Sequence, residues 1–367
     1  MHLLIVSPAR LVRQYGARGT ERILARVAAL ESARRAAGLI TARLIPEAGM
    51  DDPGVPPADP ASPEELRAQI VRLADGLARR GTPLTSVLLV GGPTALPFFP
   101  CPNPMPDDDD RIPSDYPYGV RHLDGLLLDW AVGRLPDGSG DDPGGLLRLL
   151  ALATSLHRRP PAPPRAFGYS TAAWQGAAAA IYARLDDPGR LLLAPPISAD
   201  TLDRRRLHGA SRIFCNVHGV AARPTWYGQA AGRRGELVVA LRPRDLDGLA
   251  LTGAVVVCPA CYGAFSPSYD LADTIAMRML LQGAACFIGA TTLSYGPAGL
   301  PLLGADLLAY HVFGAAADPG ARAGDLLRIG RERTLADTLR QQGFLDDDDV
   351  KTLVQFVSYG DPALRVA

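Results

Sequence analysis

Two stretches of the sequence decide the fold: residues 211–219 read SRIFCNVHG, and residues 254–263 read AVVVCPACYG. Each contains an apolar run of the length of a buried strand, and each then reaches a reactive side chain, His218 in the first stretch and Cys261 in the second. Continuous apolar strands are typical of a parallel sheet, in which the carboxyl ends of neighbouring strands lie at the same edge. We therefore expect His218 and Cys261 to face one cleft.

Short apolar runs alternate with helix-period segments through the rest of the chain. Before residue 157, the pattern predicts strands at 3–6, 39–45 and 87–90 and helices at 19–36 and 62–80. Ser62, Pro63 and Glu65 give the second helix an N-cap, a first-position proline and an acidic first turn. Further on, strands are predicted at 166–169, 191–193, 213–217, 237–241, 254–258 and 286–289, and helices at 172–184, 270–282 and 323–342. This alternation predicts an α/β fold with a mostly parallel sheet and helices on both faces.

A proline-rich segment divides the sequence into two parts. Residues 157–164 read HRRPPAPP, which fits neither a helix nor a central strand. We therefore predict an N-terminal non-catalytic α/β subdomain at 1–159 and a catalytic subdomain at 165–367. A second segment rich in Pro and Asp, 93–112, is predicted to be a surface loop and the site of any maturation cleavage.

The composition narrows the range of partners and compartments. The 367 residues carry a formal net charge of zero, and no basic stripe interrupts the sequence, so we expect neither a nucleic-acid partner nor binding to an anionic membrane. The apolar run at the N-terminus has the length of a strand, not of a signal peptide, and no run has the length of a membrane span. Five sparsely spaced cysteines favour reduced thiols and a cytoplasmic location.

The pairing of Cys261 with His218 suits nucleophilic catalysis. A thiolate attacks a carbonyl carbon, and an imidazole with a pKa near neutrality can give a proton to the departing group. Backbone amides must stabilise the oxyanion that forms, and those of Gly219 and Cys261 are the candidates. A short loop between Cys261 and the helix at 270–282 would also place a helix N-terminus near the thiol.

Other interpretations of these residues compete with catalysis. A cysteine at a strand end is commonly a small core residue, which suits Cys215, Cys258 and Cys286. The spacing of Cys258 and Cys261 is also that of a CxxC redox motif, whereas a zinc site would need a second ligand pair that the sequence lacks. The four adjacent aspartates at 107–110 lack the alternating spacing of a calcium loop, so a solvated turn is the better interpretation.

At the two strand ends the sequence resembles the gingipain family of cysteine peptidases, which are relatives of caspases. The resemblance extends over nearly the whole chain, from residue 3 to residue 366. Its motifs are SDYPYG at 114–119, DWAVGRLP at 129–136, CYG at 261–263, CFIGATT at 286–292 and YGDPALRV at 359–366. Within them, Asp115, Arg134 and the Gly-Asp-Pro at 360–362 are expected to be structural.

The resemblance implies a caspase-like three-layer α/β/α sandwich, with a mostly parallel sheet in two side-by-side subdomains. It implies a cysteine endopeptidase, a hydrolase that needs no cofactor or metal, with Cys261 as nucleophile and His218 as its acid–base partner. The partners implied are a protein or peptide substrate and a regulatory protein. Because the secreted members carry signal peptides and propeptides that this sequence lacks, an intracellular processing or regulatory protease is expected.

The residues that bind substrate are harder to assign. The loop after the strand at 166–169 contributes Trp174 and Gln175 as one candidate wall of the specificity pocket, and Trp226 and Tyr262 are further candidates. No acidic residue matches a specificity motif of the family, so the residue preferred at the cleaved bond stays open. A catalytically silent binding or scaffold module on the same fold, and a dithiol redox protein, are the alternative functions.

Overall fold

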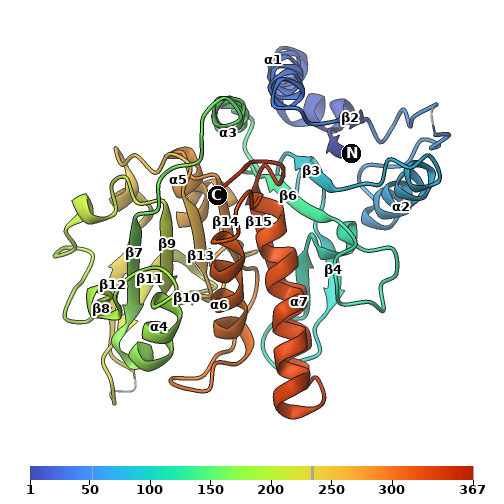
Figure 1. The fold of residues 1–367 in the computed structure, drawn as a ribbon. Coiled ribbons are helices and arrows are strands. Elements are labelled where there is room, and N and C mark those ends of the chain that lie inside the picture. Colours follow the sequence, from blue (N-terminus) through green and yellow to red (C-terminus); the bar gives the residue numbers. More distant parts are fainter. Residues whose placement is uncertain (52, 233–234, 367) are drawn as a thin grey trace.

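The computed structural model describes residues 1–51, 53–232 and 235–366, and a ten-stranded sheet forms its centre (Figure 1). The predicted α/β class and the caspase-like sandwich are confirmed. From one edge to the other, the strands are β2 (Thr41–Leu44), β1 (His2–Ile5), β3 (Ser86–Val90), β6 (Ala131–Leu135), β15 (Phe356–Gly360), β14 (Cys286–Ala290), β13 (Val255–Cys258), β9 (Arg212–Asn216), β7 (Ala166–Thr171) and β8 (Leu192–Ala194).

Strand β15 joins two half-sheets that run in opposite directions. It pairs antiparallel with β14 and parallel with β6, whereas the neighbouring pairs within each half are parallel. The segment 157–164 runs between α3 and β7, and β15 comes from far beyond it in the sequence. The two parts of the chain therefore share one continuous sheet.

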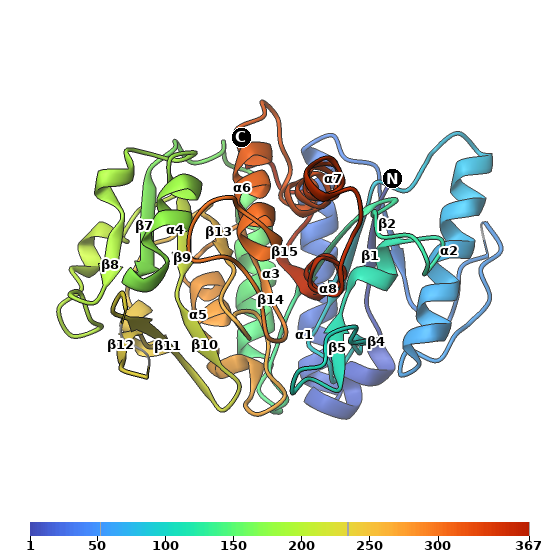
Figure 2. The ribbon, with the colours of Figure 1, turned by 90° about the horizontal axis from the view of Figure 1, so that it is seen from below.

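Helices cover both faces of the sheet and complete the three layers (Figure 2). One face packs against α1 (Pro8–Ala36), α3 (Gly144–Leu156) and α5 (Ile275–Leu281). The other face packs against α2 (Pro63–Arg79) in the first half and against α4 (Gln175–Tyr182), α6 (Gly304–Ala316) and α7 (Ala323–Gln342) in the second. The short helix α8 (Asp347–Gln355) lies beside β5 (Arg111–Ser114).

The helix N-termini show why local sequence predicted some boundaries well. Ser62 caps α2 as expected, because its hydroxyl accepts a hydrogen bond of 3.2 Å from the amide of Glu65. Helix α1 begins eleven residues before its predicted start, at Pro8, where Ser7 accepts from the amide of Arg10. Gly16, with φ of 68°, interrupts the helical geometry inside α1, and this break hid the first part of the helix from a periodicity argument.

Three predicted elements need correction. The strand at 237–241 exists as β12 (Leu237–Leu241), but it lies in a separate antiparallel sheet with β11 (Arg223–Gln229) and β10 (His218–Val220). The helix predicted at 270–282 is shorter, since α5 begins only at Ile275. The loop at 93–112 contains a hairpin of β4 (Phe99–Pro102) and β5.

The residues expected to be structural are indeed buried in ion pairs. Arg134 Nη2 lies 2.6 Å from Asp115 Oδ1, and both side chains are almost fully excluded from solvent. Asp361 receives hydrogen bonds from Arg34 of α1 and from His157 after α3, at 3.0 and 2.8 Å. These contacts tie the closing motif to the first half of the chain.

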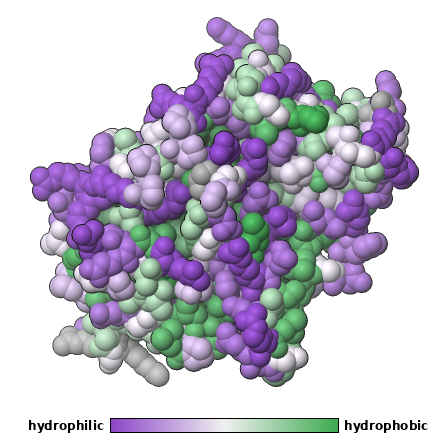
Figure 3. Space-filling model, in the orientation of Figure 1, coloured by the Kyte–Doolittle hydropathy of each residue, from purple (hydrophilic) through white to green (hydrophobic). Residues whose placement is uncertain are grey.

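The surface is mixed, in keeping with the neutral net charge. Polar side chains are spread over the face on which α6 and α7 lie, with apolar groups between them (Figure 3). Among the described residues, no helix combines the length and apolar character needed to cross a bilayer.

Candidate active site

The strands that precede His218 and Cys261 are neighbours in the sheet. β9 pairs parallel with β13, with Ile213 opposite Val256 and Phe214 opposite Val257. His218 follows β9 after one residue, and Cys261 follows β13 after two. The parallel register therefore brings both residues to the same edge of the sheet, as the sequence predicted.

The thiol of Cys261 is held by the loop that follows β14. The amide of Ser294 donates a hydrogen bond to Sγ at 3.2 Å, and the thiol can donate to the carbonyl oxygen of Ser294 at 3.5 Å. Burial raises the pKa of Cys261, while the Ser294 amide and the ammonium of Lys351 act in the opposite direction. The resting group is therefore a thiol that needs a base.

His218 is oriented by two neighbours. Its Nε2 lies 3.0 Å from Oε1 of Gln229, and its ring centroid lies 4.2 Å from that of Trp174. Burial lowers the pKa of His218, and the hydrogen bond to Gln229 offsets part of this effect. Because an amide oxygen only accepts, the contact places the ring proton on Nε2 and leaves Nδ1 able to take a proton.

Gly219 brings the two strand ends into contact. A Cβ atom at Gly219 would lie 1.8 Å from the carbonyl oxygen and 3.7 Å from the amide nitrogen of Cys261. Only a residue without a side chain can fit there. The residue after His218 therefore touches the backbone of Cys261, and the two proposed oxyanion donors are close neighbours.

We expect Gly219→Ala to lower kcat/KM by about 10²-fold or more, because a shift of about 1 Å between reacting groups has an effect of this size. The measurement is steady-state peptide hydrolysis beside thermal unfolding. Gly140→Ala is the matched control, since a Cβ at Gly140 meets nothing within 4 Å. Equal activity of the two variants would contradict the close approach of Gly219 to the nucleophile.

A small cavity of about 50 Å³ adjoins the thiol. It is lined by Trp174, Asn216, Pro259, Cys261, Ser294, Tyr295, Gly296, Ala305 and Asp306. Asp306, at the start of α6, is hydrogen-bonded to Asn216 at 3.0 Å, and burial raises its pKa to about 7. No motif pointed to Asp306, because a single aspartate in the first turn of a helix looks like an ordinary capping residue.

The candidate substrate-binding residues differ in their position relative to the cavity. Trp174 lines the cavity beside Cys261 and packs on His218. Gln175 is exposed at the start of α4, outside the cavity lining. Trp226 is a core residue, 3% exposed and 6.4 Å from Phe287 between ring centroids, which corrects its assignment to substrate binding.

Tyr262 also needs correction. Its side chain is 7% exposed, and its hydroxyl donates a hydrogen bond to Asp109 at 2.9 Å instead of facing the cavity. It therefore ties the residue after Cys261 to the loop of the β4–β5 hairpin.

The remaining cysteines do not support redox or zinc chemistry. Cys258 is completely buried, and burial raises its pKa well above that of a free thiol, so it is poorly suited to disulfide exchange. Cys101, Cys215 and Cys286 are buried as well, and all five cysteines are free thiols. The helix N-terminus considered for Cys261 is not close in sequence, since α5 begins at Ile275.

Two acidic segments bring carboxylates close together. In the hairpin, Asp107 and Asp109 pair with the buried Lys351, at 2.5 and 3.0 Å, so the prediction of a solvated turn holds only for the exposed Asp108 and Asp110. An ammonium occupies the place between the two carboxylates.

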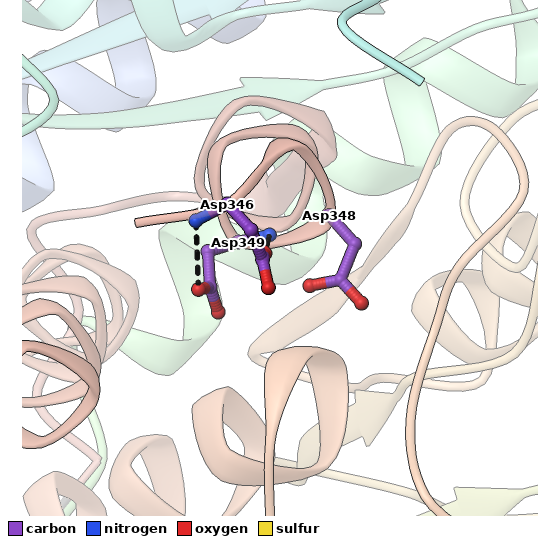
Figure 4. A group of neighbouring side chains, drawn as sticks. All are labelled: Asp346, Asp348 and Asp349. Carbon is purple, nitrogen blue, oxygen red and sulfur yellow. Dashed lines mark hydrogen bonds between the residues drawn. The ribbon is translucent and has the colours of Figure 1, made fainter. Parts of the chain in front are cut away.

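The second acidic group, Asp346, Asp348 and Asp349, lies at the start of α8 (Figure 4). Asp346 accepts from the amide of Asp349 at 3.1 Å, and Asp349 accepts from the amide of Asp346 at 3.3 Å. These reciprocal bonds form a capping box, which accounts for the close approach of Asp346 and Asp349.

The last third of the chain is similar to a known protein family. Residues 243–367, which include Cys261, match the model of peptidase family C25, the gingipain family. The chain is gingipain-like. The match indicates a cysteine peptidase, which is a hydrolase. A search among curated proteins found no match.

Solved structures support the gingipain-like fold along the whole chain. The Arg-specific cysteine proteinase gingipain R (RgpB) aligns with 100% of this chain and 78% of its own, at a TM-score of 0.67 and 15% identity. The complex of the pro- and mature domains of RgpB from Porphyromonas gingivalis aligns with 100% of this chain and 80% of its own, at a TM-score of 0.67 and 14% identity. A structure described as a protease aligns with 100% of this chain and 78% of its own, at a TM-score of 0.66 and 11% identity.

Proposed function

We propose that the protein is a cysteine endopeptidase in which Cys261 and His218 form the catalytic dyad. The observation that carries the proposal is the contact of Gly219, next to His218, with the backbone of Cys261. The small cavity beside the thiol gives the reacting bond a place, with Trp174 and Ser294 in its lining. A protein or peptide is the proposed substrate.

The proposed reaction proceeds through an acyl-enzyme. His218 takes the thiol proton at Nδ1, and Sγ of Cys261 attacks the carbonyl carbon of the peptide. The amides of Gly219 and Cys261 donate to the oxyanion. The tetrahedral intermediate collapses to a thioester when the amine leaves with the proton from His218. Water then adds to the thioester, and its hydrolysis returns the thiol and releases the acid.

The test is twofold. Purified protein should cleave members of a positional-scanning peptide library, and an acyloxymethyl-ketone probe should label Cys261 and no other cysteine. Protein that neither cleaves a peptide nor labels at Cys261 contradicts the proposal. A Cys261→Ala protein that retains its full biological effect would favour the scaffold module instead.

The pH dependence of kcat/KM follows from the direction of the His218 pKa. His218 must be neutral to accept the thiol proton, and burial lowers its pKa from the ordinary value of 6.5. Activity is therefore expected to rise with pH through a half-point below 6.5. An acidic half-point above 7 in a pH profile of kcat/KM would contradict this assignment.

We also propose that the protein acts inside the cell, as a processing or regulatory protease. The five free thiols support this, since reduced cysteines suit a reducing compartment. A pulldown with Cys261→Ala as a substrate trap would test it, and capture of only secreted proteins would contradict it.

A further inference from the structure

The only lysine of the sequence, Lys351, is buried beside the candidate active site. It lies on α8, and its side chain is 0% exposed. Its ammonium donates to Asp107 Oδ2 at 2.5 Å and to Asp109 Oδ2 at 3.0 Å, and it lies 5.6 Å from the ring centroid of Tyr295. Both aspartates come from the loop of the β4–β5 hairpin, in the first half of the chain.

The two carboxylates reach from Lys351 to the loops that hold the nucleophile. Asp109 accepts from the hydroxyl of Tyr262 at 2.9 Å and from the amide of Leu293 at 2.8 Å. Asp107 accepts from the hydroxyl of Tyr295 at 2.7 Å. Tyr262 follows Cys261 directly, and Leu293 and Tyr295 flank Ser294, whose amide binds Sγ. The two residues that flank Ser294 and the residue that follows Cys261 are therefore tied to the same ion-pair cluster.

The backbone at Tyr262 needs such support. Among the described residues, Tyr262 is the one residue other than glycine with a positive φ, at 53°. A bulky side chain in this region is strained and persists where the surroundings fix it. The hydrogen bond from its hydroxyl to Asp109 anchors the far end of the side chain, so the cluster helps to hold the turn that presents Cys261.

Burying the charged groups of this cluster also has a large desolvation cost. Removing one partner of a buried ion pair is strongly destabilising, whereas an apolar substitute for the whole cluster can be as stable. The hydrogen bonds to Tyr262, Leu293 and Tyr295 are what an apolar substitute could not supply. This favours a role in fixing the loops over a role in stability alone.

We propose that Lys351, together with Asp107 and Asp109, is a positioning group that holds Cys261 in its reactive geometry. Through it, the hairpin of the non-catalytic half becomes part of the active-site support. The proposal rests on the proposed role of Cys261 as the nucleophile. Lys351 is not itself among the residues that line the cavity, and it meets that lining at the ring of Tyr295. Its effect therefore passes through Tyr295, through Asp107 and Asp109, and through the two loops.

The charges around the thiol add a measurable signature. The ammonium of Lys351 lowers the pKa of Cys261, and the carboxylate of Asp109 raises it. The other titratable groups that act with Cys261 are Cys258, Tyr262 and Tyr295, and Asp306 lines the same cavity. Lys351→Met removes the cation and leaves the carboxylates, so the pKa of Cys261 should rise. Because the thiolate is the species that is alkylated, the alkylation profile should move to higher pH.

The experiment measures the rate at which iodoacetamide alkylates Cys261, by mass spectrometry of its peptide, as a function of pH. It also measures kcat and KM for a cleaved peptide. For Lys351→Met we expect the alkylation midpoint to move upward and kcat to fall about 10- to 100-fold, with KM within about threefold. Asp109→Asn and Tyr262→Phe should lower kcat by smaller factors. Asp108→Asn is the matched control, because Asp108 is exposed in the same loop.

The proposal would be overturned if Lys351→Met had the same alkylation profile and the same kcat as the control Asp108→Asn. If Lys351→Met does not fold, the same two measurements on Asp109→Asn and Tyr262→Phe test the proposal. Values equal to those of the control would overturn the proposal as well. A wild-type protein that cleaves no peptide contradicts the proposed function instead, and the alkylation comparison still tests the positioning.

Discussion

Replacing Cys261 by alanine is expected to lower kcat/KM for peptide hydrolysis by at least about 10⁴-fold, because no other group can form the acyl-enzyme. His218→Ala should lower it by about 10²- to 10⁴-fold, the usual contribution of a general acid–base. Both variants should unfold at nearly the temperature of the wild type, since Cys261 and His218 are only partly buried. The measurement is hydrolysis of the best peptide from the positional scan.

Cys258→Ala is the control for this prediction. It removes the other sulfur of the CxxC pair from a fully buried position, so it should lower stability slightly and leave kcat/KM within about threefold. Loss of activity in Cys258→Ala together with a measurable disulfide couple would favour the redox alternative. Retention of activity in Cys261→Ala would remove the nucleophile from the proposed mechanism.

Replacing Asp361 by alanine is expected to destabilise the fold by about 3–5 kcal/mol, because it leaves Arg34 buried without its partner. Both side chains are fully buried, and His157 also binds the carboxylate. Urea unfolding measures the loss, and Asp110→Ala, at an exposed aspartate, is the control. A loss below about 1 kcal/mol would show that the cluster contributes little to holding the two halves together.

The direction in which pH changes the stability contributed by Asp361 follows from the pKa of its carboxyl group. Burial alone would raise the pKa of Asp361, but the charge of Arg34 and the hydrogen bond from His157 outweigh it and hold this pKa far below the ordinary value. The carboxylate therefore contributes stability above the pKa it has in the unfolded chain, near 3.9, and loses it only as the pH falls toward the folded pKa.

Local signals in the sequence were enough for several strands of the central sheet and for the edge at which His218 and Cys261 lie, but they did not reveal β6 or β15. The apolar runs before His218 and Cys261 form β9 and β13, and the capping residues at 62–65 begin α2 where expected. These features depend on a few adjacent residues, so periodicity and cap chemistry could predict them. Because β9 and β13 are parallel neighbours, both end at the same edge of the sheet, which could also be predicted.

Contacts between distant residues could not be predicted in this way. Lys351 meets Asp107 and Asp109 across more than 240 positions, and nothing in a run of four aspartates distinguishes the two that are paired from the two that are exposed. Trp226 was misassigned for a related reason. An aromatic residue near a catalytic histidine can face a substrate or a core, and only the packing of β11 on Phe287 decides between them.

The central position of β15 has a consequence for how the protein is made. Until residues 356–360 have been synthesised and docked, β6 and β14 each present an unpaired edge, and unpaired edges recruit strands from other molecules. Lys351 lies just ahead of this strand, so its ion pairs with Asp107 and Asp109 cannot form earlier either. A ribosome stalled before this point would leave a chain that is prone to aggregate and unable to cut its neighbours.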